Sequence, residues 1–167
     1  MMLMEGSGHL KGRLQIVSSI LLGGIVLMSL ATAPPKSAAA RQPVLVGAQV
    51  GPQVLAILQR SCQDCHSDMT HYPWYSYVAP VSWLIRKDVT HGRQHLNLSR
   101  WGEYSIQRRE RSLSEIANQV KDREMPLPQY TVIHRTARLS DAEVDAVFQW
   151  TQAERSRLIS ENSPGAR

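Results

Sequence analysis

The chain has 167 residues, of which 43% are hydrophobic and 20% are charged, and this length and composition suit one globular domain with a terminal extension. The formal net charge is +5, and residues 41–167 keep +3 without any block of consecutive Lys or Arg, so nothing indicates a nucleic-acid-binding protein. A mildly basic surface is compatible with an acidic partner protein or with anionic lipid.

The N-terminus predicts a membrane anchor or an export signal. Residues 1–13 carry Lys11 and Arg13 and are expected to stay in the cytoplasm, because positive charge is retained inside. The uncharged residues 14–33 are long enough to cross a hydrocarbon core of about 30 Å as one helix, and longer than the ~7–15 residues of a signal-peptide core. Small residues at 31–33 and 38–40 leave a cleaved signal as the alternative, and a buried core helix as a further one.

The rest of the chain is divided by composition into a linker, one domain and a tail. Residues 34–53 are rich in Pro, Ala, Gly and Val and are expected to form a flexible linker. Residues 54–155 form the predicted domain, which begins with a short helix over 54–60. Residues 156–167 are expected to be a disordered tail.

The sequence Cys62-Gln63-Asp64-Cys65-His66 contains both cysteines of the chain. A Cys-x-x-Cys-His run is typical of a c-type haem attachment site. On a helical turn Cys62 and Cys65 share one face, from which both can form thioethers with one porphyrin, and His66 is then the expected proximal ligand of the iron. A disulfide at this spacing would close only a small loop, and a thioredoxin-like pair would follow a strand, which this sequence lacks. The haem motif agrees with export, because c-type haem is attached outside the cytoplasm.

The elements after the motif are expected to be helices and loops. A proline-interrupted aromatic loop over residues 71–77 precedes a helix over 81–96, and Ser99 is a candidate cap for the short segment that follows. The next helix is predicted over 112–122, an irregular loop over 124–128, and a last helix from Ser140 to about Arg155. Capping boxes are expected at the starts of both helices, Ser112 with Glu115 and Ser140 with Glu143. The four tryptophans, Trp74, Trp83, Trp101 and Trp150, are expected mostly in the core, with some possible haem contacts. No strand is expected, so the predicted class is all-α: a small, cytochrome-c-like helical domain.

A second axial ligand is sought among the methionines and histidines. Met69 follows His66 too closely to reach the opposite face of the same haem, whereas Met125 lies in a loop stiffened by prolines and is the favoured distal ligand. A core methionine is the alternative for Met125. His91 and His95 have zinc-like spacing but are expected to be exposed; either of them, His71 or His134 stays open as an iron ligand.

The segments CQDCHS, HYPWYSYVAPVSWLI, HGRQHLNLSRW and EMPLPQY occur in an order that resembles a family of bacterial c-type haem-binding domains. The resemblance covers about residues 54–150, and members of the family are usually small and preceded by one membrane-spanning segment. It implies one covalent haem c on Cys62 and Cys65, His66 as the proximal ligand, and Met125-Pro126 as the distal segment. Leu127 stands where similar sequences often have a second proline, which affects the shape of the loop but not the sulfur.

The expected function is one-electron transfer by a single-pass protein of the bacterial inner membrane, with its haem domain in the periplasm. Expected partners are periplasmic or membrane-bound redox proteins, and no enzymatic activity is expected. The alternatives are a haem-based sensor or peroxidase-like protein with an open or displaceable sixth ligand, and a haem module that assembles with another membrane protein. The resemblance predicts the cofactor more firmly than the role.

Overall fold

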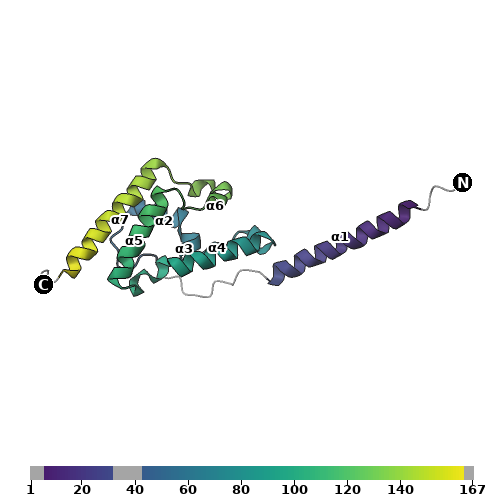
Figure 1. The fold of residues 1–167 in the computed structure, drawn as a ribbon, viewed down its shortest axis with the longest axis horizontal. Helices are drawn as coiled ribbons and strands as arrows, with labels where there is room; N and C mark the ends of the chain where they lie inside the picture. The colour runs from purple at the N-terminus through teal and green to yellow at the C-terminus, as the bar shows by residue number, and fades with distance from the viewer. Residues whose placement is uncertain (1–5, 32–42, 164–167) are drawn as a thin grey trace. The chain divides into compact units, whose positions relative to one another are not determined.

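The computed structural model describes residues 6–31 and 43–163 (Figure 1), and every element in these ranges is a helix or a loop, so the fold is all-α as predicted. The described residues divide into two compact units, residues 6–31 with 72–88, and residues 43–71 with 89–163. The α-helices are α1 (Gly6–Ala31), α2 (Pro52–Ser61), α3 (Gln63–His66), α4 (Val81–His95), α5 (Ile106–Lys121), α6 (Pro128–Ile133) and α7 (Asp141–Asn162). The 3₁₀ helices are η1 (Trp74–Tyr77), η2 (Leu98–Glu103) and η3 (Arg135–Ala137).

The first unit contains α1, η1 and the first half of α4. Within the described ranges α1 is the one helix that is long and apolar enough to cross a membrane, with a mean hydropathy of 2.1 over Lys11–Ala31. Its leucine and isoleucine side chains are exposed along the helix, as a lipid-facing helix requires. Residues 32 and 33 of the predicted span lie outside the described residues.

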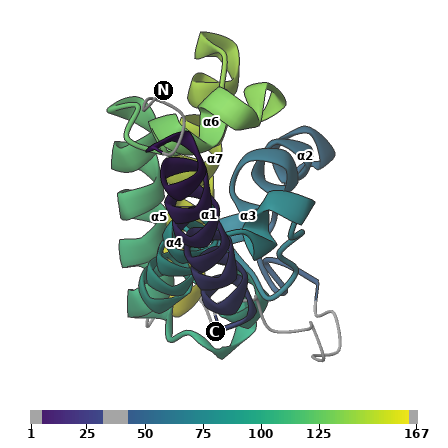
Figure 2. The same ribbon diagram turned by 90° about the vertical axis from the view of Figure 1, so that its right-hand side faces the viewer.

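The second unit is built around the pairing of α5 with α7, which lie side by side in both ribbon views (Figures 1 and 2). Helix α2 packs against α7, and the α3 turn contacts η2. The side chain of Trp101, from η2, is completely buried. The core of this unit consists of Leu45, Ile57, Leu58, Leu98, Trp101, Leu113, Val120, Leu139, Val144, Val147, Trp150 and Leu158.

Part of the predicted linker belongs to this core. Leu45 is buried, and its backbone N–H donates to the carbonyl oxygen of Leu98 at 2.9 Å. The indole N–H of Trp150 donates to the carbonyl oxygen of Gln49 at 2.9 Å. The expectation of a flexible linker is therefore wrong for residues 43–53, because apolar side chains in this segment gain by burial against the helices. Residues 32–42 lie outside the described residues.

Helix α5 begins six residues earlier than predicted. Its N-cap is Ser105, whose side chain accepts from the backbone N–H of Arg108, whereas Ser112 is buried inside the helix. The predicted capping box at Ser112 is therefore wrong. The helix already includes the charged residues before Ser112, which show no apolar periodicity and so gave no helix signal in the sequence. The predicted capping box of Ser140 and Glu143 is confirmed at the start of α7.

Helix α7 continues beyond the predicted end at Arg155. Leu158 is buried in the core, and Arg157 pairs with both Glu154 and Glu161 at 2.6 Å. These contacts stabilise two further turns, so the expectation of disorder is wrong for residues 156–162. Residues 164–167 lie outside the described residues.

Two shorter segments also differ from expectation. Asn97 rather than Ser99 caps η2, because the Asn97 side chain accepts from the backbone N–H of Ser99. The helix α6 was not predicted; it begins at Pro128, which fits the first position of a helix.

The tryptophans divide between core and surface. Trp101 and Trp150 are buried as predicted, but Trp74 and Trp83 are exposed, which corrects their expected place in the core. The reason lies in their segment: η1 and the first turns of α4 belong to the first unit, which offers these side chains no comparable core.

Candidate functional site

The cysteine motif forms a tight helical turn immediately after α2. Helix α2 ends at Ser61, α3 covers Gln63–His66, and the backbone N–H of His66 donates to the carbonyl oxygen of Cys62 at 3.0 Å. Cys62, Cys65 and His66 lie together on this one turn, and all three residues are half-buried. In the described part of the chain the two cysteines are present as thiols rather than as a disulfide.

Burial, together with the charge of Cys65, raises the pKa of the Cys62 thiol to about 12. The sulfur of Cys62 is therefore a neutral thiol at neutral pH. Since the thiolate is the species that exchanges disulfides, this environment disfavours attack by the sulfur of Cys62.

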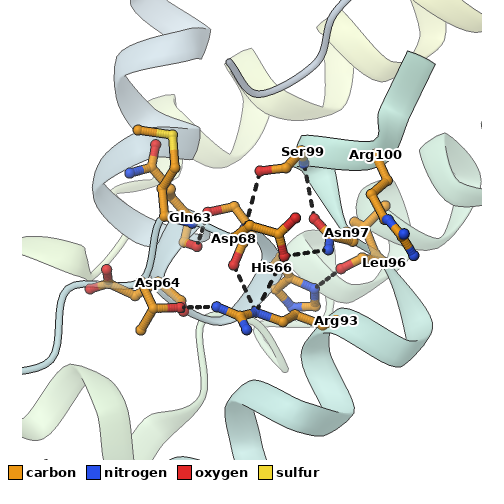
Figure 3. Close-up of polar contacts among 12 residues, drawn as sticks. Gln63, Asp64, His66, Asp68, Arg93, Leu96, Asn97, Ser99 and Arg100 are labelled. Atoms are coloured by element: carbon orange, nitrogen blue, oxygen red, sulfur yellow. Dashed lines mark hydrogen bonds and ion pairs between the residues drawn. The ribbon is translucent and has the colours of Figure 1, made fainter. Parts of the chain in front are cut away.

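The imidazole of His66 is oriented by the backbone of the segment after α4. Its Nδ1 lies 3.1 Å from the carbonyl oxygen of Leu96 (Figure 3). A carbonyl oxygen can only accept, so the neutral ring carries its proton on Nδ1 and leaves the lone pair of Nε2 for a metal. Metal-ligating histidines are commonly held in this way by a backbone carbonyl.

Burial lowers the pKa of His66 below its usual value of 6.5, although backbone hydrogen bonds to Leu96 and Gly92 act in the opposite direction. The ring is therefore neutral at neutral pH, which is the form that binds iron.

Gly92 allows α4 to approach the cysteine turn closely. A Cβ atom built on Gly92 would lie 2.6 Å from the carbonyl oxygen of Cys65 and 3.3 Å from the Cys65 Cβ. The first distance is shorter than real Cβ contacts, so only glycine fits here without a shift of backbone. The same stretch of chain supplies the carbonyl group that orients His66, so Gly92 sets the distance between that group and the turn.

Asp64, inside the cysteine motif, joins the turn to two other segments. Its Oδ1 accepts from the backbone N–H of His71 at 2.9 Å, and its Oδ2 accepts from the hydroxyl of Tyr130 at 2.8 Å. Its carbonyl oxygen also accepts from the hydroxyl of Thr70 at 2.6 Å. A residue at a variable position of the motif thus fixes both the chain that follows it and the distant helix α6.

Arg93 fixes the far side of the same turn (Figure 3). Its guanidinium donates to the carbonyl oxygen of Ser67 at 2.8 Å and to the hydroxyl of Thr70 at 2.8 Å. Nearby, the side-chain amide of Asn97 donates to Asp68 at 2.9 Å. The residues after His66 are therefore held against α4 and the start of η2 by charged and polar contacts.

Met125 lies in the loop between α5 and α6. Its backbone N–H donates to the carbonyl oxygen of Gln119 at 3.1 Å, its peptide bond to Pro126 is cis, and its side chain is half-buried. Tyr130, five residues later, makes the hydrogen bond to Asp64 described above. The structure thus ties the segment of Met125 to the cysteine turn through α6.

The other candidate ligands are histidines outside the Cys62–His66 turn. His91 and His95 are exposed on α4, and His71 is exposed after the turn. The ring of His134 stacks on that of Tyr130 with centroids 4.3 Å apart. Among the described residues no group of three His, Cys, Asp or Glu side chains is arranged to hold a metal ion, so the zinc-like spacing of His91 and His95 is not completed.

The family comparison agrees with this geometry. A family model described as a haem-binding domain matches residues 20–153, which is most of the chain. Comparison with curated proteins and with solved structures gives no match.

The residues of the turn fit a haem group. Two thiols and one imidazole are presented by one turn, the imidazole is neutral with Nε2 available, and glycine leaves room for close packing behind the turn. The cysteines, His66 and Met125 remain predictions from the sequence, and the supporting contacts of Asp64, Gly92 and Tyr130 were not predicted. A glycine inside a predicted helix indicates that another segment packs closely against that helix. This was the sequence signal from which the role of Gly92 could have been predicted.

Proposed function

Because the chain belongs to the family of haem-binding domains, we propose that this haem-binding protein is a monohaem c-type cytochrome that transfers single electrons at the outer face of a membrane. In this proposal Cys62 and Cys65 hold one haem c through two thioethers, and His66 is the proximal ligand. The haem supplies an iron that cycles between the ferric and ferrous states.

The hydrogen bond from Tyr130 to Asp64 is the observation that carries the proposed distal ligand. It holds α6 against the cysteine turn, and α6 begins three residues after Met125. Because the backbone of Met125 is also bonded to the end of α5, the loop is fixed at both ends. This arrangement supports Met125 as the sixth ligand.

Ligation by His66 and Met125 favours electron transfer over chemistry at the iron. The protein would fill both axial positions, leaving no open site for a substrate, and a thioether ligand raises the reduction potential. Leu96 fixes the orientation of His66, so the proximal side would change little between oxidation states. This is why a carrier is proposed rather than a peroxidase or a sensor.

The length and hydropathy of α1 support the proposed export and anchoring. As an anchor or as a signal, such a helix after Lys11 and Arg13 would place the cysteine turn outside the cytoplasm. We infer a single-pass anchor in a bacterial inner membrane, with the second unit in the periplasm.

A basic hollow beside the cysteine turn suggests the charge of the partner. It has a volume of about 600 Å³, and Arg93, Arg100 and Arg108 line it together with one carboxylate, that of Glu103. Arg93 also binds the carbonyl oxygen of Ser67, next to His66. Such a surface attracts an acidic redox protein and orients it toward the haem.

The attachment of haem is tested with the double variant Cys62→Ser, Cys65→Ser. Wild-type protein should retain haem on a denaturing gel, and the double variant should lose it, because serine forms no thioether. Loss of haem from the wild type on that gel would contradict covalent attachment.

Binding of carbon monoxide to the folded protein is a second test. The ferrous wild type should bind carbon monoxide slowly or not at all, and rapid binding would favour the sensor or peroxidase alternative.

A further inference from the structure

The first unit exposes a group of large apolar side chains that its fold does not cover. Trp74 is 78% exposed, and the neighbouring members of the group are also exposed, although they lie in well-formed helices and turns. This aromatic patch consists of Trp74, Tyr77, Val78, Val81, Trp83 and Leu84. Large apolar side chains exposed together in one short segment indicate an interaction surface.

One hydrogen bond fixes where this patch lies along the membrane helix. The backbone N–H of Ala79, in the middle of the patch, donates to the Oγ of Ser29 at 3.1 Å. That hydroxyl in turn donates to the carbonyl oxygen of Ile25, so it is held by α1 itself. Ser29 lies in the last turn of α1, whose apolar stretch ends at Ala31. The patch therefore lies at the level where α1 would leave the hydrocarbon.

The chemistry of the patch suits that level of a bilayer. Trp and Tyr are enriched at membrane–water interfaces, because their rings are apolar and their N–H and O–H groups can remain hydrated. Lys87 lies one turn after Trp83 on α4, and Arg86 precedes it; both are exposed. Basic side chains beside an interfacial ring can reach anionic lipid headgroups while their stems cover apolar surface.

We propose that the aromatic patch inserts into the interfacial layer of the membrane beside α1, and that it binds lipid as a second point of attachment. The proposal rests on the proposed membrane anchor. The second attachment would fix the orientation of residues 72–88. A single membrane helix leaves the attached residues free to rotate, whereas a second contact beside the helix end holds them against the bilayer surface.

The test uses the full-length haem-loaded protein in vesicles of phosphatidylcholine and phosphatidylglycerol. Tryptophan fluorescence is compared between ordinary vesicles and vesicles whose acyl chains carry bromine either near the headgroup or near the chain end. The N-terminal helix contains no tryptophan, so quenching reports only on the four tryptophans after it. We expect quenching by bromine, stronger from the shallow position than from the deep one.

The variant Trp74→Phe, Trp83→Phe should lose most of this quenching, because it removes the two interfacial fluorophores and keeps aromatic rings in their place. The matched control Trp150→Phe removes a buried fluorophore of the second unit and should keep it. An unchanged haem absorption spectrum in each variant shows that the protein is folded.

Absence of bromine quenching in wild-type protein that floats with the vesicles would overturn the proposal while leaving the anchor intact. Failure of the protein to float would instead contradict the anchor itself. A changed haem spectrum in the Trp74, Trp83 variant without any bromine quenching would assign the patch to the haem and overturn its lipid role.

Discussion

At the scale of single residues, Asp64 gathers three hydrogen bonds at a position that the cysteine motif leaves open. Two of them reach its carboxylate from Tyr130 and His71, and one reaches its carbonyl oxygen from Thr70. A carboxylate so engaged holds the proximal turn and the loop of the proposed distal ligand in one arrangement. Asp64 is thereby a positioning residue for the proposed haem site.

Removing the hydroxyl of Tyr130 tests this role. Tyr130→Phe keeps the ring stacked on His134 but removes one hydrogen bond to a carboxylate, which should lower the free energy of unfolding by about 1–3 kcal/mol. Urea unfolding followed by haem absorbance and by circular dichroism measures the loss. The exposed Tyr77→Phe is the control and should change stability little. Equal stability of both variants would show that the bond to Asp64 does not hold the site.

Gly92 gives a second residue-scale prediction. Gly92→Ala should destabilise the protein by about 1–3 kcal/mol through overpacking, even though alanine is the better helix former. The added Cβ would meet the carbonyl oxygen of Cys65, a backbone atom that cannot turn away. Gly102→Ala is the control, because its Cβ would meet only ordinary contacts, the nearest at 3.5 Å. Yield of haem-loaded protein and the urea midpoint measure both; a Gly92→Ala protein as stable as wild type would contradict the close contact.

The sequence could predict the candidate haem-binding residues but not the residues that position them. Cys62, Cys65 and His66 are set by chemistry at fixed spacing, which a sequence displays directly. Asp64 and Tyr130 are 66 residues apart and meet only through the packing of α6 on the turn. No local sequence pattern predicts a contact between residues so far apart in the chain. The hydrogen bond between Ala79 and Ser29 could not be predicted for the same reason.

At the scale of elements, α2 is joined to α7 just before the cysteine turn. Arg60, two residues before Cys62, forms an ion pair with Glu143 at 2.8 Å. Glu143 also closes the capping box at the start of α7 by accepting from the backbone N–H of Ser140 at 2.9 Å. One carboxylate therefore caps one helix and holds the end of another.

This arrangement predicts a pH dependence. The hydrogen bond from Ser140 and the pairing with Arg60 hold the pKa of Glu143 below its usual value of 4.5. Since the folded-state pKa is depressed, the stabilisation is full above pH 4.5 and is lost as pH falls through the folded-state pKa. Glu143→Gln should cost about 0.5–1 kcal/mol near neutral pH, and the difference from wild type should shrink on acidification.

Urea unfolding at several pH values from about 7 down to about 3 measures this difference. Glu103→Gln, which breaks only the exposed pair with Arg100, is the control and should show a small difference throughout. A Glu143→Gln difference that stays constant with pH would contradict the depressed pKa.

Helices were predictable where apolar periodicity and a cap coincided. The start of α7 at Ser140 meets this condition, whereas α4 was predictable from its apolar periodicity after Pro80. The first turns of α5 are mostly charged, and the last turns of α7 are held by the buried Glu154 and its partner Arg157. Polar residues that are held in a helix by tertiary contacts give no hydrophobic periodicity. The predicted start of α5 was therefore too late in the chain, and the predicted end of α7 was too early.

At the scale of the whole molecule, the family match at residues 20–153 extends from within α1 to within α7 and so includes parts of both units. The apolar helix α1 is thus matched in part, together with the aromatic segment and the cysteine turn. The match therefore supports haem binding for a chain that includes both units.

The central claim is that His66 and Met125 hold the iron of a covalently attached haem. It is tested most directly by proton NMR of the reduced protein, in which the methyl group of a methionine bound to haem iron is shifted strongly upfield by the porphyrin ring current. We predict one such resonance in the wild type, its loss in Met125→Ala, and its retention in the matched control Met69→Ala. An upfield methyl resonance that persists in Met125→Ala, or one that is absent from the wild type, would contradict the proposed ligation.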